Sequence, residues 1–213
     1  MVFTWDDDWR DAVPQKKKRR MKTAAAAPAE TGGRKTALLI AAVLVVAVAG
    51  LVFYWVQSSK VEAKFLELAA AGQSGLSAVQ SSPSRGRNHL QPGQGFNYGD
   101  DFPTSGDHAP VWTEAGVYSS PQPKIELVHA LEHGNIVIYT DDPGEEVMKT
   151  LEDWAGLYSA QWSGIVIIRK PGLGSKVVLS AWTKRLFLDP FDPAPAAAFI
   201  DTYRGRGPEH PVR

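Results

Sequence analysis

The chain has 213 residues, of which 23 are basic, 23 are acidic and none is cysteine. The lack of cysteine excludes disulfide bonds, thiol redox chemistry and thiolate metal ligands. Residues 1–57 carry nine Lys or Arg against five Asp or Glu, so residues 58–213 carry fourteen against eighteen, and this mildly acidic part offers no basic stripe for DNA or RNA.

An uncharged stretch without proline, Ala37–Val56, predicts a transmembrane helix over residues 36–57. It follows the basic cluster Lys16–Lys22 and the pair Arg34-Lys35. The positive-inside bias therefore predicts a single-pass protein of the bacterial inner membrane, with a basic cytoplasmic tail (residues 1–35) that can contact membrane lipids and a periplasmic or extracellular C-terminal part. A cleaved signal peptide is the alternative, because Ala47-Val48-Ala49 has small residues at the spacing that a signal peptidase prefers.

The tail and the span both carry features that favour contact with a membrane partner. Trp5 and Trp9 are four residues apart and would share one helical face. Ala42, Ala49 and Gly50 place small residues on the span, where they let helices approach closely in lipid. We therefore expect these residues to bind an integral membrane protein complex.

Beyond the span, the pattern predicts a helix and a Ser/Gly-rich linker over residues 58–86, and then an outer domain over residues 87–213. The helix covers residues 60–71 and is ended by Gly72. The predicted elements of the domain are a strand at 111–118, a helix at 121–133, a strand at 135–140, a helix at 144–160, a hairpin of strands at 164–170 and 176–182, and a helix at 194–203. The order βαβαββα indicates an α/β fold with a thioredoxin-like sheet that lacks the cysteines.

Histidine spacing gives the sharpest chemical signal in the chain. His129 and His133 lie four apart on one predicted helix, as ligands of a divalent metal do, and His108 ends a compact turn before it. With His89 or Met148 as a fourth ligand, the set would suit copper or zinc outside the cell. The structural alternative is that His133 caps the helix C-terminus, His129 is half-buried and Met148 belongs to the core.

The run His-Ala-Leu-Glu-His at 129–133 also matches the H-x-x-E-H pattern of inverted zinc peptidases, in which the glutamate, here Glu132, is the general base. Gly134 ends the predicted helix at once, whereas a peptidase helix would continue and a later helix would supply a third carboxylate ligand. The pattern is therefore a weak indication of hydrolysis.

Tryptophan is frequent in the outer domain. Trp112 and Trp162 are predicted as exposed partner-binding anchors, and Trp154 and Trp182 as core residues.

Five runs taken together resemble the bacterial domain-of-unknown-function family DUF3105. They are PTSGDH (103–108), GVYSSPQP (116–123), LVHALEHG (127–134), SAWTKR (180–185) and FIDTYRGRGPE (199–209). The resemblance implies a single span with an outer domain and no assigned activity, and it places His108, His129, Glu132, His133 and Gly134 on motif positions. Asp107 stands where the family tends to have proline, which predicts a less rigid loop, and Thr183 stands where it tends to have glycine.

Together these features predict a non-enzymatic accessory subunit whose outer domain docks on a larger membrane assembly, such as one of respiratory or photosynthetic electron transport. The alternative is an extracytoplasmic copper- or zinc-binding domain that uses His108, His129 and His133. A metal-dependent hydrolase is the third hypothesis.

Overall fold

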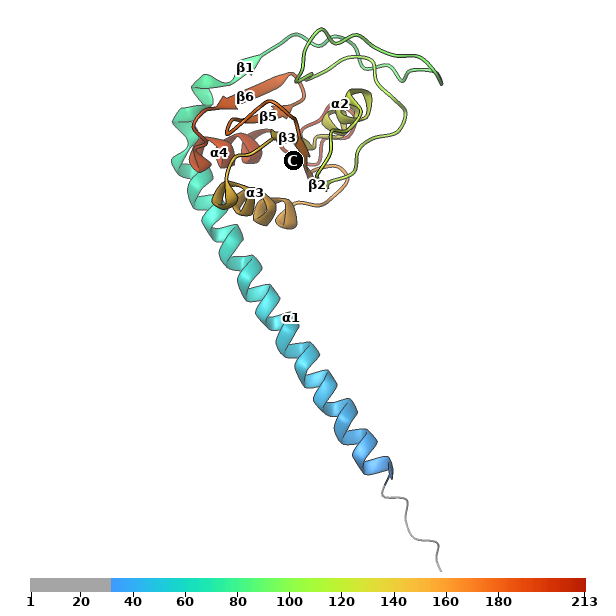
Figure 1. The fold of residues 1–213 in the computed structure, drawn as a ribbon, viewed down its shortest axis with the longest axis vertical. Helices are drawn as coiled ribbons and strands as arrows, with labels where there is room; N and C mark the ends of the chain where they lie inside the picture. The colour runs from blue at the N-terminus through green and yellow to red at the C-terminus, as the bar shows by residue number, and fades with distance from the viewer. Residues whose placement is uncertain (1–31) are drawn as a thin grey trace, which may run out of the picture. The chain divides into compact units, whose positions relative to one another are not determined.

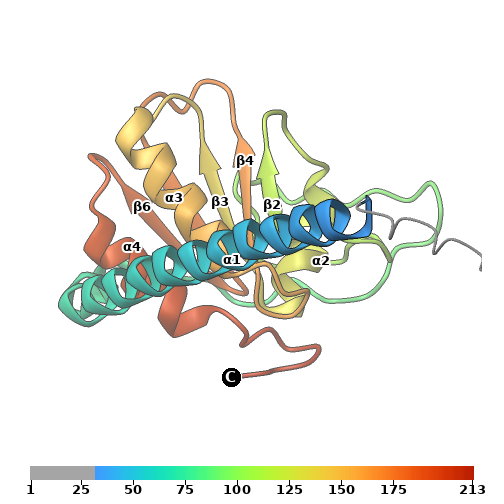
Figure 2. The same ribbon diagram turned by 90° about the horizontal axis from the view of Figure 1, so that it is seen from below.

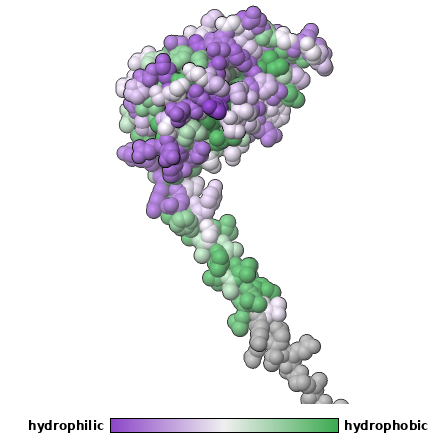
Figure 3. All heavy atoms as spheres, viewed as in Figure 1, coloured by the Kyte–Doolittle hydropathy of each residue, from purple (hydrophilic) through white to green (hydrophobic). Residues whose placement is uncertain are grey.

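The computed structural model describes residues 32–213, which form eleven helical and strand elements. The first is α1 (Gly32–Ala71), one continuous helix of 40 residues (Figure 1). From Thr36 on it is long and apolar enough to cross a membrane, with a mean hydropathy of 2.9 in its most apolar window. Its apolar side chains are exposed, and they dominate the surface of this part of the helix (Figure 3). The predicted apolar span is therefore a helix, compatible with a single-pass membrane or signal-anchor protein.

The chain divides into two compact units, residues 1–47 and residues 48–213. Within the second unit, the last turns of α1 belong to the hydrophobic core. The side chain of Phe65 is fully buried, and its ring meets the edges of Trp154 and Tyr158 at centroid distances of 5.4 and 5.2 Å. The helix ends before Gly72, as predicted, at a point where a Cβ atom would lie 1.9 Å from the carbonyl oxygen of Ala194.

The structure differs from the predicted linker that follows. Residues Gln73–Ala78 form a 3₁₀ helix, η1, and Gln80–Ser81 form a short strand, β1, which pairs antiparallel with β6 (Lys184–Leu188). A Ser/Gly-rich composition resembles that of a linker, but here the small residues allow close contact. A Cβ atom on Gly75 would lie 2.5 Å from the side chain of Pro195.

A six-stranded mixed sheet is the centre of the domain. Its remaining strands are β2 (Gly116–Tyr118), β3 (Ile136–Thr140), β4 (Ile165–Arg169) and β5 (Val177–Ala181), in the spatial order β1-β6-β5-β3-β4-β2. The labelled strands β6, β3, β4 and β2 follow one another in this order in Figure 2. Strands β2, β4 and β3 are mutually parallel, whereas β5 and β6 are antiparallel additions. The α/β class is confirmed.

The predicted hairpin joined the wrong strands. β5 pairs with β3 and with β6, and not with β4. Strand β6 was not predicted, because the turn Trp182-Thr183 that joins it to β5 contains no glycine or asparagine. These are the residues that usually mark a two-residue hairpin turn. Thr183 nevertheless adopts φ +60°, a left-handed conformation that favours glycine.

Two layers cover the sheet because its strands bury side chains on both faces. Ile136 and Ile138 face α3 (Glu145–Leu157), α4 (Pro193–Tyr203) and the end of α1. Val137 and Tyr139 face α2 (Lys124–His133) and the irregular segment 82–115. A long segment without regular structure is uncommon in a compact domain and is often functional. Here it supplies two histidines to the α2 side of the sheet.

Candidate metal centre

All five histidines of the chain lie in one connected cluster. The ring of His129 is at its middle, with centroids 4.9 Å from His89, 4.8 Å from His108 and 4.6 Å from His133. Trp162 contacts His133 at 4.1 Å and links it to His210 at 5.2 Å. His108, His129 and His133 are at most 2% exposed. Histidine is only intermediate in its tendency to be buried, so three fully buried histidines in one cluster are the main chemical feature of the domain.

Helix α2 fixes two of these rings. It begins after Pro123, whose carbonyl oxygen accepts hydrogen bonds from the amides of Glu126 and Leu127, and it ends at Gly134, whose φ of +97° forms a left-handed cap. His129 and His133 are one turn apart on the buried side of this short helix, as their spacing predicted.

The irregular segment brings His89 and His108 together through a parallel backbone bridge. The amide of Leu90 donates to the carbonyl of His108 at 2.7 Å, and the amide of His108 donates to the carbonyl of Asn88 at 3.0 Å. Asp107 strengthens this pairing, since its Oδ1 accepts hydrogen bonds from the backbone amide and the side-chain amide of Asn88. Asp107 therefore gives this loop side-chain hydrogen bonds that a proline at this position could not make.

His108 has one ring nitrogen anchored and one directed at a carboxylate. Its Nδ1 lies 2.9 Å from the carbonyl oxygen of Gly106, which can only accept, so Nδ1 carries a proton. Its Nε2 lies 3.0 Å from Oε2 of Glu132. In a neutral ring this Nε2 presents a lone pair to the carboxylate, so the pair requires a proton or a cation between the two atoms.

Glu209 completes the other side of the cluster from the C-terminal loop. Its Oε2 is 3.1 Å from Nε2 of His133 and 3.6 Å from Nε2 of His129. The loop lies directly on the end of α2, where the amide of Gly205 donates to the carbonyl of Gly134 and the amide of Glu209 donates to that of Glu132. Only glycine fits at Gly207, since a Cβ atom there would lie 2.1 Å from the carbonyl oxygen of Glu132.

The motifs LEHG and RGRGPE thus meet at a glycine-to-glycine contact and share one site. Glu209 had no place in the sequence prediction, because a single acid in a terminal loop has no periodic signal. The RGRGPE run was the available indication, since two glycines beside a charged residue allow a close backbone approach.

Burial favours the neutral, ligand form of the rings. It lowers the pKa of His129 to about 4, with further contributions from the charges on His133, His108 and His89, while the carboxylate of Glu209 acts in the opposite direction. The pKa of His133 is also lowered, chiefly by burial. Burial raises the pKa of Glu132, against the influence of His108. At neutral pH, His129 is therefore an uncharged imidazole with lone-pair capacity.

Four buried ring nitrogens have no hydrogen-bond partner among residues 32–213: Nε2 of His108, Nδ1 and Nε2 of His129, and Nδ1 of His133. Nearly all buried polar atoms in proteins have a partner, so four in one cluster require an explanation. Two groups offer ligand atoms that all lie within 4.8 Å of one another. The first is His89, His108, His129 and Glu132, and the second is His129, His133 and Glu209. Imidazole and carboxylate are the ligands that zinc and copper(II) accept.

Two tryptophans predicted as exposed anchors lie against the site. Trp112 and Trp162 contact His133 at centroid distances of 4.6 and 4.1 Å, and both are half-buried. They shield the imidazoles from bulk solvent. Trp154 is a core residue, as predicted, whereas Trp182 is half-buried at the edge of the α2-side core, 6.5 Å from His108.

The other predicted site residues lie elsewhere. Met148 packs in the core on the α3 side of the sheet, so it is not near the histidines and the alternative of a core methionine is correct. Ala42, Ala49 and Gly50 are exposed on α1. Trp5 and Trp9 lie outside the described residues.

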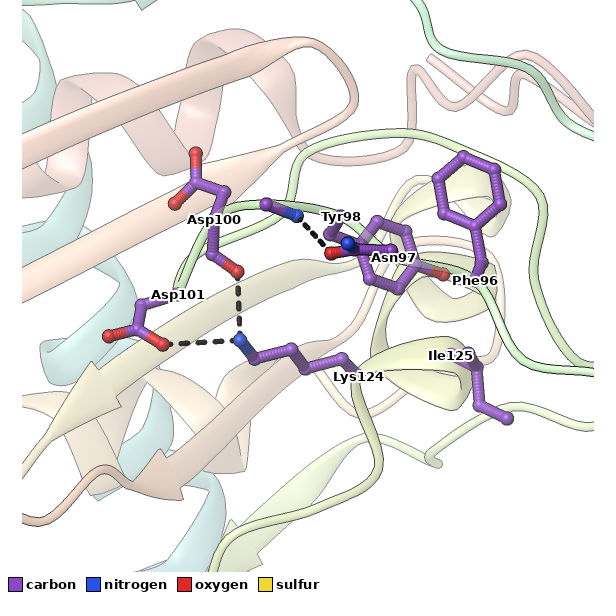
Figure 4. A pocket seen from close by; sticks show the side chains of 8 residues that line it. Phe96, Asn97, Tyr98, Asp100, Asp101, Lys124 and Ile125 are labelled. Carbon is purple, nitrogen blue, oxygen red and sulfur yellow. Dashed lines mark hydrogen bonds and ion pairs between the residues drawn. The ribbon is translucent and has the colours of Figure 1, made fainter.

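Apart from the histidine cluster, the domain has a cavity of about 590 Å³ between residues 96–101 of the irregular segment and the start of α2 (Figure 4). The ammonium group of Lys124 donates to the carbonyl of Asp100 at 2.8 Å and to Oδ1 of Asp101 at 3.1 Å. Hydrogen bonds from Lys124 and Lys170 lower the pKa of Asp101. The charged groups Lys124 and Asp101 of this cavity are thus paired with each other, and no histidine lines the cavity. The chemistry of the domain is therefore concentrated at the histidine cluster.

Fold and site together define an α/β protein with one long apolar helix and a buried histidine-carboxylate cluster in its C-terminal domain. The chain belongs to the family described as protein of unknown function (DUF3105), whose family model matches residues 89–213. The match includes every histidine of the cluster and Glu209. No curated protein and no solved structure matches the chain.

Proposed function

We propose that this protein is a membrane-anchored metal-binding protein whose C-terminal domain holds copper(II) or zinc at the histidine cluster. The observation that carries the proposal is the set of unpartnered nitrogens on three buried histidines, close to two carboxylates. An unpaired buried polar atom costs about 1–3 kcal/mol, and a divalent cation would satisfy these atoms together.

A proton is the competing explanation for the contact between His108 and Glu132. An imidazolium at His108 would form a buried ion pair with the carboxylate. That pair would account for one nitrogen only. It leaves both nitrogens of His129 without a partner among the described residues, and the low pKa of His129 keeps that ring neutral. A cation accounts for both rings.

The ligand types favour particular metals. The chain has no cysteine, and Met148 packs on the opposite face of the sheet, so residues 32–213 supply the cluster with no soft sulfur ligand for copper(I). Mixed nitrogen and oxygen ligands suit copper(II) and zinc, which bind such sets more tightly than most other divalent ions of the first transition row.

Metal titration of the full chain in detergent micelles tests the proposal. Isothermal titration with zinc, and separately with copper(II), should give binding at neutral pH, and the alanine variant His129→Ala should weaken it, because His129 belongs to both ligand groups. His210→Ala is the matched control, because His210 contacts Trp162 but belongs to neither ligand group. Lack of binding of either ion by the wild-type chain would refute the proposal and leave the cluster structural.

The location of the site outside the cytoplasm is part of the proposal. It is supported by the charge asymmetry, since Lys16–Lys22, Arg34 and Lys35 precede the apolar stretch. Protease added to intact spheroplasts should remove residues 58–213 and leave the tail. Protection of the whole chain would contradict this orientation.

A hydrolytic function receives less support from the same geometry. His129, His133 and Glu209 form the His₂Glu set of some catalytic zinc sites. The third ligand, the carboxylate of Glu209, comes from a loop and not from a later helix as in the peptidases. The candidate base Glu132, however, lies 3.0 Å from His108 and is itself a member of the first ligand group. A general base must be free to accept a proton from an attacking water, so we favour metal binding over hydrolysis.

The docking of this protein on a larger membrane assembly, respiratory or photosynthetic, is a second proposal. The exposed small residues of α1 support it, since a Cβ atom on Gly50 would meet nothing within 4 Å. Replacement of residues 37–56 by polyleucine keeps the apolar length and removes this surface. Loss of co-purifying membrane proteins is the expected result, and unchanged co-purification would refute a specific role for the helix.

A further inference from the structure

We propose that the cluster is a binuclear centre in which the imidazole of His129 bridges two metal ions. This inference rests on the proposed metal-binding function and adds the number of ions and the role of one residue. It follows from three features: two ligand groups that overlap at one residue, the unusual surroundings of the His129 ring, and the separate elements that supply the outer ligands.

The two ligand groups share His129 and no other residue. The first group, called site A, adds His89 and His108 from the irregular segment and Glu132 from α2. The second group, called site B, adds His133 from α2 and Glu209 from the C-terminal loop. Three ligands or more at each site are enough for zinc, which takes three or four protein ligands. The two groups contain six different ligand residues, which are too many for one tetrahedral ion and fit two ions.

The ring of His129 differs from an ordinary metal ligand. A ligating histidine almost always donates its other ring N–H to a carbonyl, carboxylate or water, which fixes its orientation. His108 follows this rule, because its Nδ1 donates to the carbonyl of Gly106. His129 does not, because both of its nitrogens are buried and neither has a hydrogen-bond partner among the described residues. Bridging gives each of the two nitrogens its own metal ion.

The distance to Glu209 assigns one nitrogen of His129, and the bridge then assigns the other. Its Nε2 lies 3.6 Å from Oε2 of Glu209, so Nε2 belongs to site B and Nδ1 is left for site A. Each ion forms one coordinate bond to the ring. The neutral ring has a single N–H proton, and binding of the second ion releases that proton to solvent and leaves an imidazolate.

Each site combines buried ligands with one that reaches the surface. His89 is exposed in site A, and the Glu209 side chain is 37% exposed in site B. His129 lies between them at 2% exposure. Each site therefore has a ligand that solvent reaches, and the bridge is formed inside the domain, where tryptophan side chains contact the rings.

Metal stoichiometry of the full chain in detergent micelles tests the bridge, with three variants that separate the sites. Wild type should bind two zinc ions per chain. The double variant His108→Ala/Glu132→Gln leaves two ligands at site A and should keep only the ion of site B, Glu209→Gln should keep only the ion of site A, and His129→Ala should lose site B and bind more weakly at the three remaining ligands of site A. Glu152→Gln, on the exposed side of α3, is the matched control and should bind two. Circular dichroism in the presence of a chelator confirms that each variant is folded.

Copper(II) gives an independent measure of the bridge. Two copper(II) ions joined by an imidazolate are magnetically coupled, so the electron paramagnetic resonance signal should grow with the first equivalent and fall with the second. In Glu209→Gln the signal should grow to one equivalent and then stay. A wild-type stoichiometry of one ion, or two ions with uncoupled signals, would refute the bridge while leaving metal binding intact. No bound ion would refute metal binding itself.

Discussion

The contact between Gly207 and α2 gives the sharpest prediction, because it sets the position of Glu209 and substituting it removes no ligand side chain. In Gly207→Ala the new Cβ atom would lie 2.1 Å from the carbonyl oxygen of Glu132 and 2.2 Å from the amide nitrogen of Gly134. Ordinary contact begins at 3.4 Å, so the loop must move by about 1 Å or more. Both neighbouring atoms are backbone, so they cannot rotate out of the way.

The same carbonyl accepts the hydrogen bond from the amide of Glu209, at 3.3 Å. A shift of about 1 Å is large compared with the tolerance of about 0.2 Å in metal-ligand distances, so Glu209 should leave site B. We expect the zinc affinity of site B to fall by at least about 10-fold to 100-fold, while site A is retained. Overpacking should also lower stability by about 1–3 kcal/mol.

Isothermal titration with zinc measures the first effect and thermal unfolding the second. The matched control is Gly156→Ala in α3, where a Cβ atom would meet nothing within 4 Å. It should leave metal binding unchanged and stabilise the helix by up to about 1 kcal/mol. An unaltered second binding event in Gly207→Ala would show that the glycine contact does not position Glu209.

The remaining predictions concern stability. The metal-free protein should lose stability as pH falls from the unfolded histidine value of 6.5 toward 4, because the folded pKa of His129 is lowered and the unfolded state then binds more protons. Screening near the half-exposed Glu209 limits this contribution to at most about 2 kcal/mol, and the raised pKa of Glu132 acts in the opposite direction. Thermal unfolding in the presence of a chelator, between about pH 5 and about pH 8, measures the net change in stability. A melting temperature that does not change with pH would contradict this prediction. Thr183→Gly should raise stability by about 1 kcal/mol by removing a β-branched residue from φ +60°, and a lower melting temperature would contradict that reading. Phe65→Ala should cost about 3–5 kcal/mol, since this α1 side chain is fully buried against Trp154, and a cost below about 1 kcal/mol would show that the end of α1 is not part of the core.

The regular elements of the domain followed from local patterns. The apolar runs at β3, β4 and β5 and the amphipathic pattern of α3 are strong signals, and their observed bounds lie within a few residues of the predicted ones. Strand pairing did not follow, because a run such as Ile165–Arg169 is buried on both faces and carries no information on its neighbour. The hairpin of β5 and β6 was not predicted, because threonine rarely adopts the left-handed backbone conformation that Thr183 has in its turn.

The sequence indicated the four histidines of the candidate site, His89, His108, His129 and His133, but not Glu209. His129 and His133 have helical spacing, which a sequence displays directly. Glu209 is 76 residues beyond His133 in the chain, and a contact between two backbones brings it to the site. Trp112 and Trp162 were expected at an interface because burial of a single aromatic residue cannot be read from its sequence neighbours. In the structure they are half-buried and contact His133, and their role toward a partner stays a prediction.

The energetics of the cluster lead to a final prediction, on metal removal. Three ring nitrogens without a hydrogen-bond partner, both of His129 and Nδ1 of His133, cost on the order of 3–9 kcal/mol if nothing satisfies them, and a domain of this size has only about 5–15 kcal/mol of net stability. Bound metal would offset that cost because it is present only in the folded state, and its binding free energy adds to stability. The effect should be local. α2 and the loop at 204–209 hold the ligands, whereas the α3 side of the sheet has a continuous apolar core without them. A chelator should therefore lower the melting temperature and increase amide hydrogen exchange in α2 and residues 204–209, with little change in α3. Equal exchange with and without chelator would mean that the histidine cluster is already satisfied by the protein itself.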